Sequence, residues 1–366
     1  MKLSVAKDEI QEKLSNIQNI VEKRNTMPIL SHFLLEAGKK GAHIVATDLQ
    51  IAIKEPITAK VQSEGKLCIP ARKLFEIVRE AEGEITIESD EEQWVKVSFG
   101  KSRFRLACLP SGEFPAWPGV EGAEEIKFGI DALSEMIEKT IYAAGETDSR
   151  YTLNGLLFHI RPGNEKITVV GTDGHRLALI TKEMQAKVTE EKKVIVPRKA
   201  AAELRRFFGS SEAVSAIIGK NHMLFRIGEV QFLVRLIEGT YPNYEQVLPP
   251  ANEKKMTIHR EDFLRTLKRV SIMSRERSNA VRVDISGSSL AVSSSNPDIG
   301  EARDETGVEY EGEDISAGFN ARYLMDALSA MTAEKIIFAL QDPLSPTLLK
   351  EEGSEDYKCV VMPMRI

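Results

Sequence analysis

The sequence repeats one order of short motifs three times, and this repetition limits what the chain can fold into. An amphipathic segment at residues 8–14 recurs at 131–137 and again at 261–267. The pair Thr47 and Asp48 returns as Thr172 and Asp173. Three copies of about a third of the chain each account for all 366 residues, so no copy has room for a catalytic insertion of its own. The repetition therefore favours a scaffold over an enzyme.

Each copy predicts the same order of secondary structure. An amphipathic helix comes first and opens on an acidic residue, which suits the positive end of a helix dipole. Short apolar strands follow, and then a second helix. The strands include 29–35, 153–160 and 281–285, and the second helices are expected at 71–81, 198–208 and 321–331. Two helices and many short strands per copy predict an α+β fold, with the helices on one face of antiparallel sheet.

Two further features define the copies. The last predicted strand, 106–110, matches 233–237 and 359–363, at distances of 127 and 126 residues. Segments rich in proline and glycine follow this strand near 112–123 and near 242–253. We therefore predict three domains. They span residues 1–122, 123–250 and 251–366.

Composition restricts the class of protein. With 42% hydrophobic and 28% charged residues, the chain is typical of soluble globular proteins. Its three cysteines have no metal-ligand spacing, which favours buried thiols in a reducing compartment. We find no signal peptide and no apolar segment long enough to span a membrane. The sequence therefore predicts a cytoplasmic protein with no membrane partner.

Signatures of catalysis and of metal or cofactor binding are weak. Asp173 and His175 could form a general-base pair, but no nucleophile and no glycine-rich oxyanion turn accompany them. The six histidines form no metal-binding pair, and no phosphate-binding glycine motif occurs. We expect no catalytic site, no metal site and no cofactor.

Positive charge gathers on the predicted helices although the net charge is −6. The helix at 198–208 carries four basic residues against one acidic residue, and the segment 260–273 carries four against two. For a single helix, a solvated surface explains such charges. On equivalent helices of three copies, they predict one positive surface that attracts phosphate without reading base sequence.

Several motifs carry a resemblance to a known family. The runs at 150–155 and 172–177, the run Tyr241–Tyr244 and the ending at 360–365 closely resemble the bacterial DNA polymerase III beta subunit, the sliding clamp. The resemblance covers the whole sequence. It implies a head-to-tail homodimeric ring that encircles double-stranded DNA, gives processivity to a replicative polymerase and has no catalytic site of its own.

The resemblance also implies three sets of functional residues. The DNA contacts would be Arg24, Lys73, Thr147, Tyr151 and Thr152. A pocket for partner peptides would comprise Arg150, Leu153, Thr172, Gly174, His175, Arg176, Leu177, Pro242, Val247, Val360, Met362, Pro363, Met364 and Arg365. The dimer interface would use Phe104, Leu106, Ile272 and Met273.

The implied partners are the DNA polymerase III alpha subunit, a clamp loader, and proteins that share a clamp-binding motif, such as repair polymerases, mismatch-repair proteins and ligase. The peptide pocket is physically reasonable, because a short apolar groove with methionines can adapt to several linear peptides. Two alternatives remain at this point. One is a DNA-binding ring or specialised clamp paralogue acting outside replication, and the other is an enzyme using Asp173 and His175.

Overall fold

The computed structural model describes most of the chain. The described residues are 1–21, 27–89, 93–120, 125–163, 165–183, 188–209, 211–249, 253–275 and 278–365. They form two compact units, which we treat separately. Unit 1 is built mainly from Met1–Asp131 and Lys199–Leu236, and unit 2 from Ala132–Met184, Val188–Arg198 and Ile237–Ile366.

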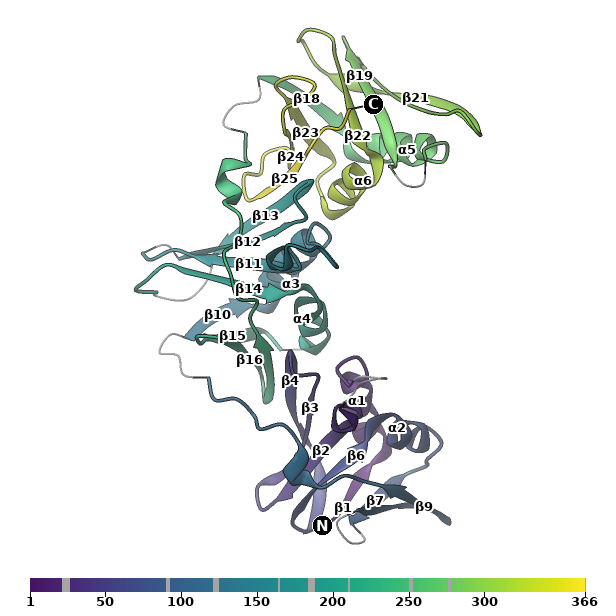
Figure 1. Cartoon of the computed structure of the whole chain (residues 1–366), viewed down its shortest axis with the longest axis vertical. Helices are drawn as coiled ribbons and strands as arrows, with labels where there is room; N and C mark the ends of the chain where they lie inside the picture. Colours follow the sequence, from purple (N-terminus) through teal and green to yellow (C-terminus); the bar gives the residue numbers. More distant parts are fainter. Residues whose placement is uncertain are drawn as a thin grey trace. The chain divides into compact units, whose positions relative to one another are not determined.

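The three repeats follow the same order of main elements (Figure 1), and the first has one additional short strand between its two helices. The first repeat has β1 (Lys2–Ala6), α1 (Lys7–Ile17), the 3-10 helix η1 (Pro28–Ser31), β2 (His32–Gly38), β3 (Gly41–Thr47), β4 (Ile51–Ile57), β5 (Ala59–Ser63), β6 (Gly65–Pro70), α2 (Ala71–Arg79), β7 (Glu84–Ser89), β8 (Trp94–Phe99), β9 (Ser102–Ala107) and η2 (Ser111–Glu113).

The second repeat has β10 (Glu125–Gly129), α3 (Ile130–Ile141), η3 (Tyr151–Leu153), β11 (Gly155–Ile160), β12 (Lys166–Thr172), β13 (Arg176–Glu183), β14 (Lys192–Pro197), α4 (Arg198–Leu204), η4 (Arg205–Phe207), β15 (Ala213–Ile218), β16 (His222–Ile227), β17 (Val230–Arg235) and η5 (Tyr244–Gln246). The third has β18 (Lys254–His259), α5 (Arg260–Ser271), β19 (Ala280–Ser286), β20 (Ser289–Asn296), β21 (Gly300–Glu309), β22 (Ile315–Asn320), α6 (Ala321–Ala330), β23 (Lys335–Leu340), β24 (Thr347–Glu351) and β25 (Tyr357–Val361). The predicted α+β class, with two main helices per repeat, is confirmed.

Consecutive repeats share antiparallel sheets. In unit 1, β17 of the second repeat pairs with β4 of the first, within one sheet of order β10-β15-β16-β17-β4-β3-β2-β6. In unit 2, β25 of the third repeat pairs with β13 of the second in the same way (Figure 1). Because a sheet continues from one repeat into the next, the boundary between the compact units falls inside the second repeat.

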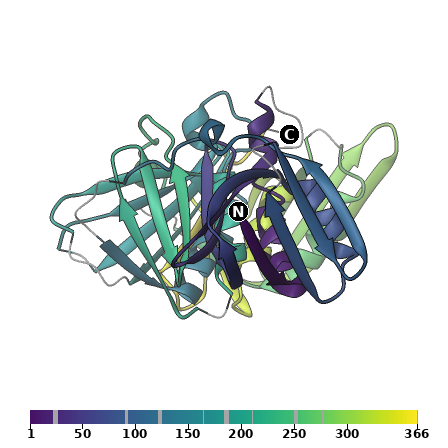
Figure 2. The same cartoon turned by 90° about the horizontal axis from the view of Figure 1, so that it is seen from below.

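Helices cover one face of these sheets. In unit 1, α1 packs against α2, and in unit 2, α5 packs against α6. The strands beneath them alternate between buried and exposed positions, as in β19, where Val281, Val283 and Ile285 are buried. The remaining sheet of unit 1 has the order β5-β1-β7-β8-β9, and it can be followed in Figure 2 from the purple β1 to the blue β9. All three cysteines are buried and free, as expected from the sequence.

Local predictions needed correction at the starts of two strands. Residues 29–31 and residue 153 belong to 3-10 turns before the strands, since Pro28 fixes a helical φ at the first of these turns. Pro70 is the N-cap of α2 and the last residue of β6, so it precedes the first helical turn. As predicted, acidic residues lie in the first turns of α1, α3 and α5, where they suit the positive end of the helix dipole.

The sequence match of the last strands was wrong by one residue. Isolated bridges mark one equivalent position in each repeat, and they pair Cys68 with Leu109, Ile195 with Ile237, and Gly318 with Met364. With this register, Leu106 of the first repeat is equivalent to Val234 of the second repeat rather than to Leu233. Matching residue types had aligned one leucine with another, whereas backbone pairing decides the true register.

A buried charge pair joins the second and third repeats within unit 2. Lys139 Nζ on α3 lies 3.4 Å from both carboxylate oxygens of Glu351 on β24, and both residues are buried. Burial alone would raise the pKa of Glu351, but amide hydrogen bonds from Thr332 and Ala333 and the charge of Lys139 lower it overall. The ionised carboxylate therefore stabilises the folded state at neutral pH.

We predict that Glu351→Gln lowers the free energy of unfolding by about 2–3 kcal/mol at neutral pH, because it leaves Lys139 buried with only Glu135 as a charge partner. A lowered carboxyl pKa gives stabilisation that is lost as the pH falls through the folded-state value, so the difference should shrink below about pH 4. Urea denaturation followed by circular dichroism measures this. The exposed-pair control Glu355→Gln should cost less than about 1 kcal/mol, and equal losses in both variants would contradict the prediction.

Candidate functional site

A tight turn at residues 172–176 lies between β12 and β13 in unit 2. Thr172 Oγ1 donates to Arg176 O at 2.5 Å and accepts from Gly174 N at 3.1 Å. Asp173 Oδ1 accepts the backbone N–H groups of His175 and Arg176, at 2.9 and 3.1 Å. The carboxylate thus holds the backbone of the turn, while His175 is exposed. This geometry gives Asp173 a structural role and does not orient it as a partner for the imidazole.

Arg150 lies across this turn. Its guanidinium donates two hydrogen bonds to Asp148, at 3.0 and 2.8 Å, and Nη2 also donates to Asp173 O at 2.9 Å. The hydrogen bonds from Arg150 lower the pKa of Asp148 to about 2. Gly174 has a φ of +85°, and a Cβ there would lie 2.7 Å from Arg150 Nη1. Both the backbone conformation and the close guanidinium therefore require glycine.

Arg176 connects the turn to the third repeat. Its side chain contacts Asp173 at 3.1 Å and Asp326 of α6 at 2.5 Å, and it donates to Tyr142 O at 2.6 Å. The guanidinium also lies 4.5 Å from the ring centroid of Tyr323. Several donors of one arginine are thus engaged with fixed partners, which locks the turn against α6.

The same turn leads into an apolar cluster between β13 and β25. Leu177 pairs with Val360, and Met362 N donates to His175 O at 2.9 Å. Met362 is 38% exposed, while Leu153, Leu177 and Val360 are buried. The cluster comprises Leu153, Leu157, Val170, Leu177, Leu179, Ile195, Tyr241, Tyr244 and Val360, with Ile237, Val247, Leu248 and Leu348 packed against it. The arrangement is an apolar floor beside a polar turn whose arginines are paired with aspartates.

The structure brings most of the predicted pocket residues together. Arg150, Thr172, Gly174, His175 and Arg176 form the turn and its covering side chain. Leu153, Leu177, Val247 and Val360 belong to the apolar cluster. Pro242 lines an adjacent cavity of about 370 Å³, between β11, β14 and the segment 239–245. Met364 and Arg365 lie elsewhere, because Met364 pairs with Gly318 on β22 and both line a different cavity in the third repeat.

The first repeat contains a copy of this turn. Thr47 Oγ1 donates to Ile51 O at 2.8 Å, and Asp48 Oδ1 accepts from the backbone N–H groups of Gln50 and Ile51. Leu49 adopts the left-handed φ of +71° that Gly174 has in the second repeat. The repeated Thr-Asp pair therefore forms the same hydrogen-bonded turn in the first and second repeats.

The apolar floor of this first turn carries aromatic residues from the segment that follows β9. Phe114 and Trp117 pack on a cluster that includes Leu30, Val45 and Cys68. Trp117 also contacts the cluster formed by Ala52, Leu224 and Leu233. Tyr241 and Tyr244 occupy the corresponding cluster in the second repeat. The remaining cavity at the first turn is only about 70 Å³.

The predicted DNA-contact residues that the structure describes lie on α2, in the loop after α3 and on η3. Lys73 is on α2, with Nζ 2.6 Å from Glu76. Thr147 is exposed in the loop after α3, Tyr151 is 60% exposed at the start of η3, and Thr152 follows it. Arg24 lies outside the described residues.

Most of the predicted helical positive charge is already paired. Arg198, Lys199 and Arg206 form ion pairs with Glu146, Asp48 and Glu203, respectively. Arg260, Arg265 and Arg269 on α5 likewise contact Glu261, Asp262 and Asp304. Most of these basic side chains are well exposed, and an exposed pair is worth only about 0–1 kcal/mol. These ion pairs reduce the positive electrostatic potential around the helices. The basic side chains can still leave their acidic partners and contact phosphate instead.

The predicted interface residues are accessible. Phe104 is 38% exposed and Leu106 is half-buried on β9, which is the edge strand of its sheet. Ile272 is 75% exposed just after α5, and Met273 is half-buried beside it. A core role for Phe104, the alternative explanation of an apolar strand residue, does not fit its exposure. Among the residues that the structure describes, Gly300–Gly307 of β21 pairs with β20 only, so its outer edge is also open.

In the described ranges, no group of three or more His, Cys, Asp and Glu side chains is placed to hold a metal ion. No helix in the same ranges is long and apolar enough to cross a membrane.

Sequence reasoning missed several residues of the site. Asp148 fixes Arg150, and Tyr323 and Asp326 fix Arg176. These partners lie near in space but up to 150 residues apart in sequence. The structural role of Asp173 could have been found, because the Thr-Asp pair recurs where no histidine follows it.

Comparisons with known proteins agree with this geometry. Family models of the DNA polymerase III beta subunit match over residues 1–118 (N-terminal domain), 128–243 (central domain) and 245–365 (C-terminal domain). The chain is similar to the beta sliding clamp of Pseudomonas putida, with 33% identity over the full length of both chains.

Solved structures give the same result. The chain is similar to DNA polymerase III subunit beta sliding clamps bound to griselimycin, from Bartonella birtlesii (32% identity, TM-score 0.96) and from Pseudomonas aeruginosa (32%, 0.94). Each comparison covers all of both chains.

We predict that Asp173→Ala exposes the amides of His175 and Arg176 to hydrogen exchange, because both lose their acceptor at a cost of about 0.5–1.5 kcal/mol each. Asp48→Ala is a matched variant and should expose only Gln50 and Ile51. Exchange measured by mass spectrometry or NMR tests both. Retained protection at residues 175 and 176 in Asp173→Ala would show that the carboxylate does not hold the turn.

Proposed function

The chain belongs to the DNA polymerase III beta subunit family, the non-catalytic sliding clamps of replication, and from this membership we propose how its residues hold DNA and dock partners. We propose that two chains pair head to tail into a ring around double-stranded DNA. The ring tethers the replicative polymerase and so gives it processivity. The enzymatic alternative with Asp173 and His175 is dropped, because the family is a non-catalytic subunit.

The observation that carries this proposal is a pair of strand edges that have no partner strand among the described residues of the single chain. Two joints are formed within the chain, β4 with β17 and β13 with β25. The strands for a third such joint are present, but their outer edges are open. β9 is equivalent to β17 and β25, and the open part of β21 is equivalent to β4 and β13. Exposed strand edges invite pairing. A second copy of the chain supplies both missing partners, and two such joints close a symmetric dimer.

Exposed apolar residues support the same pairing. Ile272 follows α5 at the position that Tyr142 has after α3, and Tyr142 contacts Tyr357 and Cys359 of the next repeat at 3.0 and 3.1 Å. We infer that Ile272 and Met273 pack against the first repeat of the partner, with Phe104 and Leu106 on the adjoining strand. This arrangement would bury apolar surface that the single chain leaves in water.

DNA would be held by topology more than by strong contacts. We propose Lys73, Thr147, Tyr151 and Thr152 as contacts to the DNA backbone, together with Arg24, which lies outside the described residues. Support comes from the exposure of Tyr151 and Thr147 and from the weak ion pair of Lys73. Contacts to phosphate carry no sequence information, so the ring can slide. Paired cations also limit tight binding, which would stop sliding.

We predict that the protein, placed on nicked circular DNA by a clamp loader, stays bound through gel filtration and leaves when the circle is linearised. The dimer should have about twice the 40.8 kDa chain mass. Ile272→Arg should give a monomer that circular DNA does not retain, because a charge would have to be buried in the interface. Leu344→Arg, at another exposed apolar residue, is the control and should behave as the parent protein. Equal loss from circular and linear DNA would exclude a topological link.

We propose that the groove at the second turn docks partner proteins through short linear peptides. The apolar cluster supplies the floor, Met362 an adaptable rim, and Arg150 and His175 a polar edge. Such a groove suits extended peptides with apolar side chains. The proposed users are the polymerase alpha subunit, the clamp loader, repair polymerases, mismatch-repair proteins and ligase. Met364 and Arg365 would have a lesser part, since they line another cavity.

Griselimycin provides a probe for this groove, because two similar clamps have been solved bound to it. We predict that this chain binds griselimycin and that Met362→Arg weakens binding about tenfold or more, as a charge is placed at an apolar contact. Leu49→Arg, at the equivalent turn of the first repeat, is the matched control and should leave affinity unchanged. Calorimetry measures both. Unchanged affinity in Met362→Arg would place the ligand elsewhere.

The proposal keeps the predicted domain boundaries, 1–122, 123–250 and 251–366, which the matched family ranges support. It also includes a cytoplasmic location, where replication proteins of this family act.

A further inference from the structure

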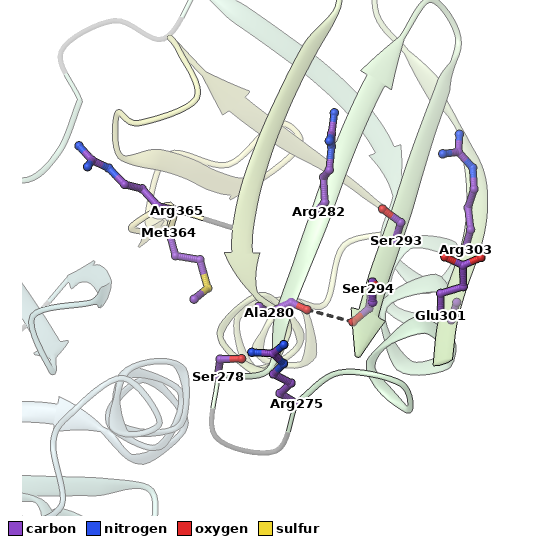
Figure 3. Close-up of a pocket in the computed structure, with 12 residues that line it drawn as sticks. Arg275, Ser278, Ala280, Arg282, Ser293, Ser294, Glu301, Arg303, Met364 and Arg365 are labelled. Atoms are coloured by element: carbon purple, nitrogen blue, oxygen red, sulfur yellow. Dashed lines mark hydrogen bonds between the residues drawn. The ribbon is translucent and has the colours of Figure 1, made fainter. Parts of the chain in front are cut away.

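A large cavity lies in the third repeat, apart from the groove described above. Its volume is about 870 Å³, within the range of ligand pockets. It lies between β19, β20, β21 and the segment after β25 (Figure 3). The lining residues are Arg275, Ser278, Ala280, Arg282, Ser293, Ser294, Ser295, Glu301, Ala302, Arg303, Met364 and Arg365.

The charge of this cavity is strongly positive. Four arginines face one glutamate in the lining, in a protein of net charge −6. Figure 3 shows the arginine side chains around the hollow, with the guanidinium groups of Arg275, Arg282 and Arg303 on different sides of it. Arg282 Nε contacts Asp284 at 2.7 Å. Arg275, Arg303 and Arg365 form no ion pair with any residue that the structure describes, unlike the arginines of α5.

The cavity lies in the third repeat at a position equivalent to the apolar clusters beside the turns of the first and second repeats. The bridge between Gly318 and Met364 corresponds to the bridges of Cys68 with Leu109 and of Ile195 with Ile237. In the first two repeats the neighbouring position is apolar and contains aromatic residues of the following segment. In the third, the described lining has no aromatic residue and is made of arginine and serine. Equivalent backbone positions thus line a basic cavity in the third repeat and an apolar cluster in each of the other two repeats.

The cavity opens on the sheet face away from the helices. On β19, Val281 and Val283 are buried on the side where α5 packs, so Arg282 between them points to the opposite face. Within unit 2 the proposed DNA contacts, Thr147, Tyr151 and Thr152, lie in the segment after α3, and none of them lines this cavity. The cavity is therefore separate from the proposed DNA contacts, which favours a protein partner.

We propose that this cavity is a second docking site, which binds an acidic peptide segment of a partner protein. Arginine pairs with carboxylates through two parallel hydrogen bonds, and four arginines can hold several Asp or Glu side chains of one extended segment. Ser293 and Ser295 offer hydroxyl groups to the peptide backbone, and Met364 offers an adaptable apolar contact. A partner could thus engage the apolar groove and this basic site with different segments. Glu301, Ala302 and Arg303 lie on the open part of β21, so in the proposed ring the partner's β9 would run beside one wall of this cavity.

Fluorescence anisotropy with fluorescein-labelled hexaglutamate tests the proposal on the full-length protein. We expect saturable binding at about 0.15 M salt, where long-range attraction is screened. Arg282→Glu combined with Arg303→Glu should weaken it about tenfold or more, since two charged hydrogen-bonding groups are replaced by repulsive ones. The matched control, Lys220→Glu with Arg226→Glu on the exposed surface of unit 1, makes the same charge change and should shift affinity less than about twofold.

Three results would overturn the site. They are no saturable binding, equal weakening in both double variants, or displacement of the peptide by a short DNA duplex or by inorganic phosphate at equal concentration. The milder pair Arg275→Gln with Arg303→Gln guards against misfolding. It should weaken binding in the same direction while the circular dichroism spectrum and the affinity for griselimycin stay unchanged. Unweakened hexaglutamate binding in this folded pair would likewise contradict the proposal.

Discussion

Strand pairing between consecutive repeats is the constraint on which this structure depends. A single repeat has two main helices and several short strands, and in each of the first two repeats one sheet has an edge that the next repeat completes. The pairing of β4 with β17 and of β13 with β25 turns three small units into continuous sheets. Unpaired backbone groups at a sheet edge favour association, so the same device predicts that β9 and β21 find partners in another chain.

The Thr-Asp turns precede the strands that pair between repeats, and their side-chain partners differ between the first and second repeats. In both repeats the threonine hydroxyl and the aspartate carboxylate satisfy the backbone of the turn before the paired strand begins. In the first repeat Asp48 receives Lys199, whereas in the second Asp173 receives Arg176, which also reaches Asp326. Equivalent backbone geometry therefore carries different side chains at each joint. The basic cavity of the third repeat shows a similar divergence of side chains at an equivalent backbone position.

The sequence alone predicted the threefold repeat, the α+β class and the second helix of each copy, because these depend on local periodicity and on motifs that recur. It did not predict that sheets continue across repeats, since alternation identifies the buried face of a strand and not its neighbour. It also overestimated the free charge on the helices. The ion pairs of Lys199 with Asp48 and of Arg269 with Asp304 join residues 151 and 35 positions apart, which no local pattern reveals. The basic cavity was missed for the same reason, as its arginines come from four separate segments.

Pairing of β9 with β21 between chains is the central claim, and amide hydrogen exchange measures it most directly. In the dimeric protein, the outward-facing amides of Ser102–Ala107 and of residues 300–306 should exchange slowly, because each strand covers the edge of the other. In Ile272→Arg, both segments should exchange rapidly while β4, β13, β17 and β25 stay protected. Rapid exchange of both edges in a protein that sediments as a dimer would contradict the account, because the chains would then associate through another surface.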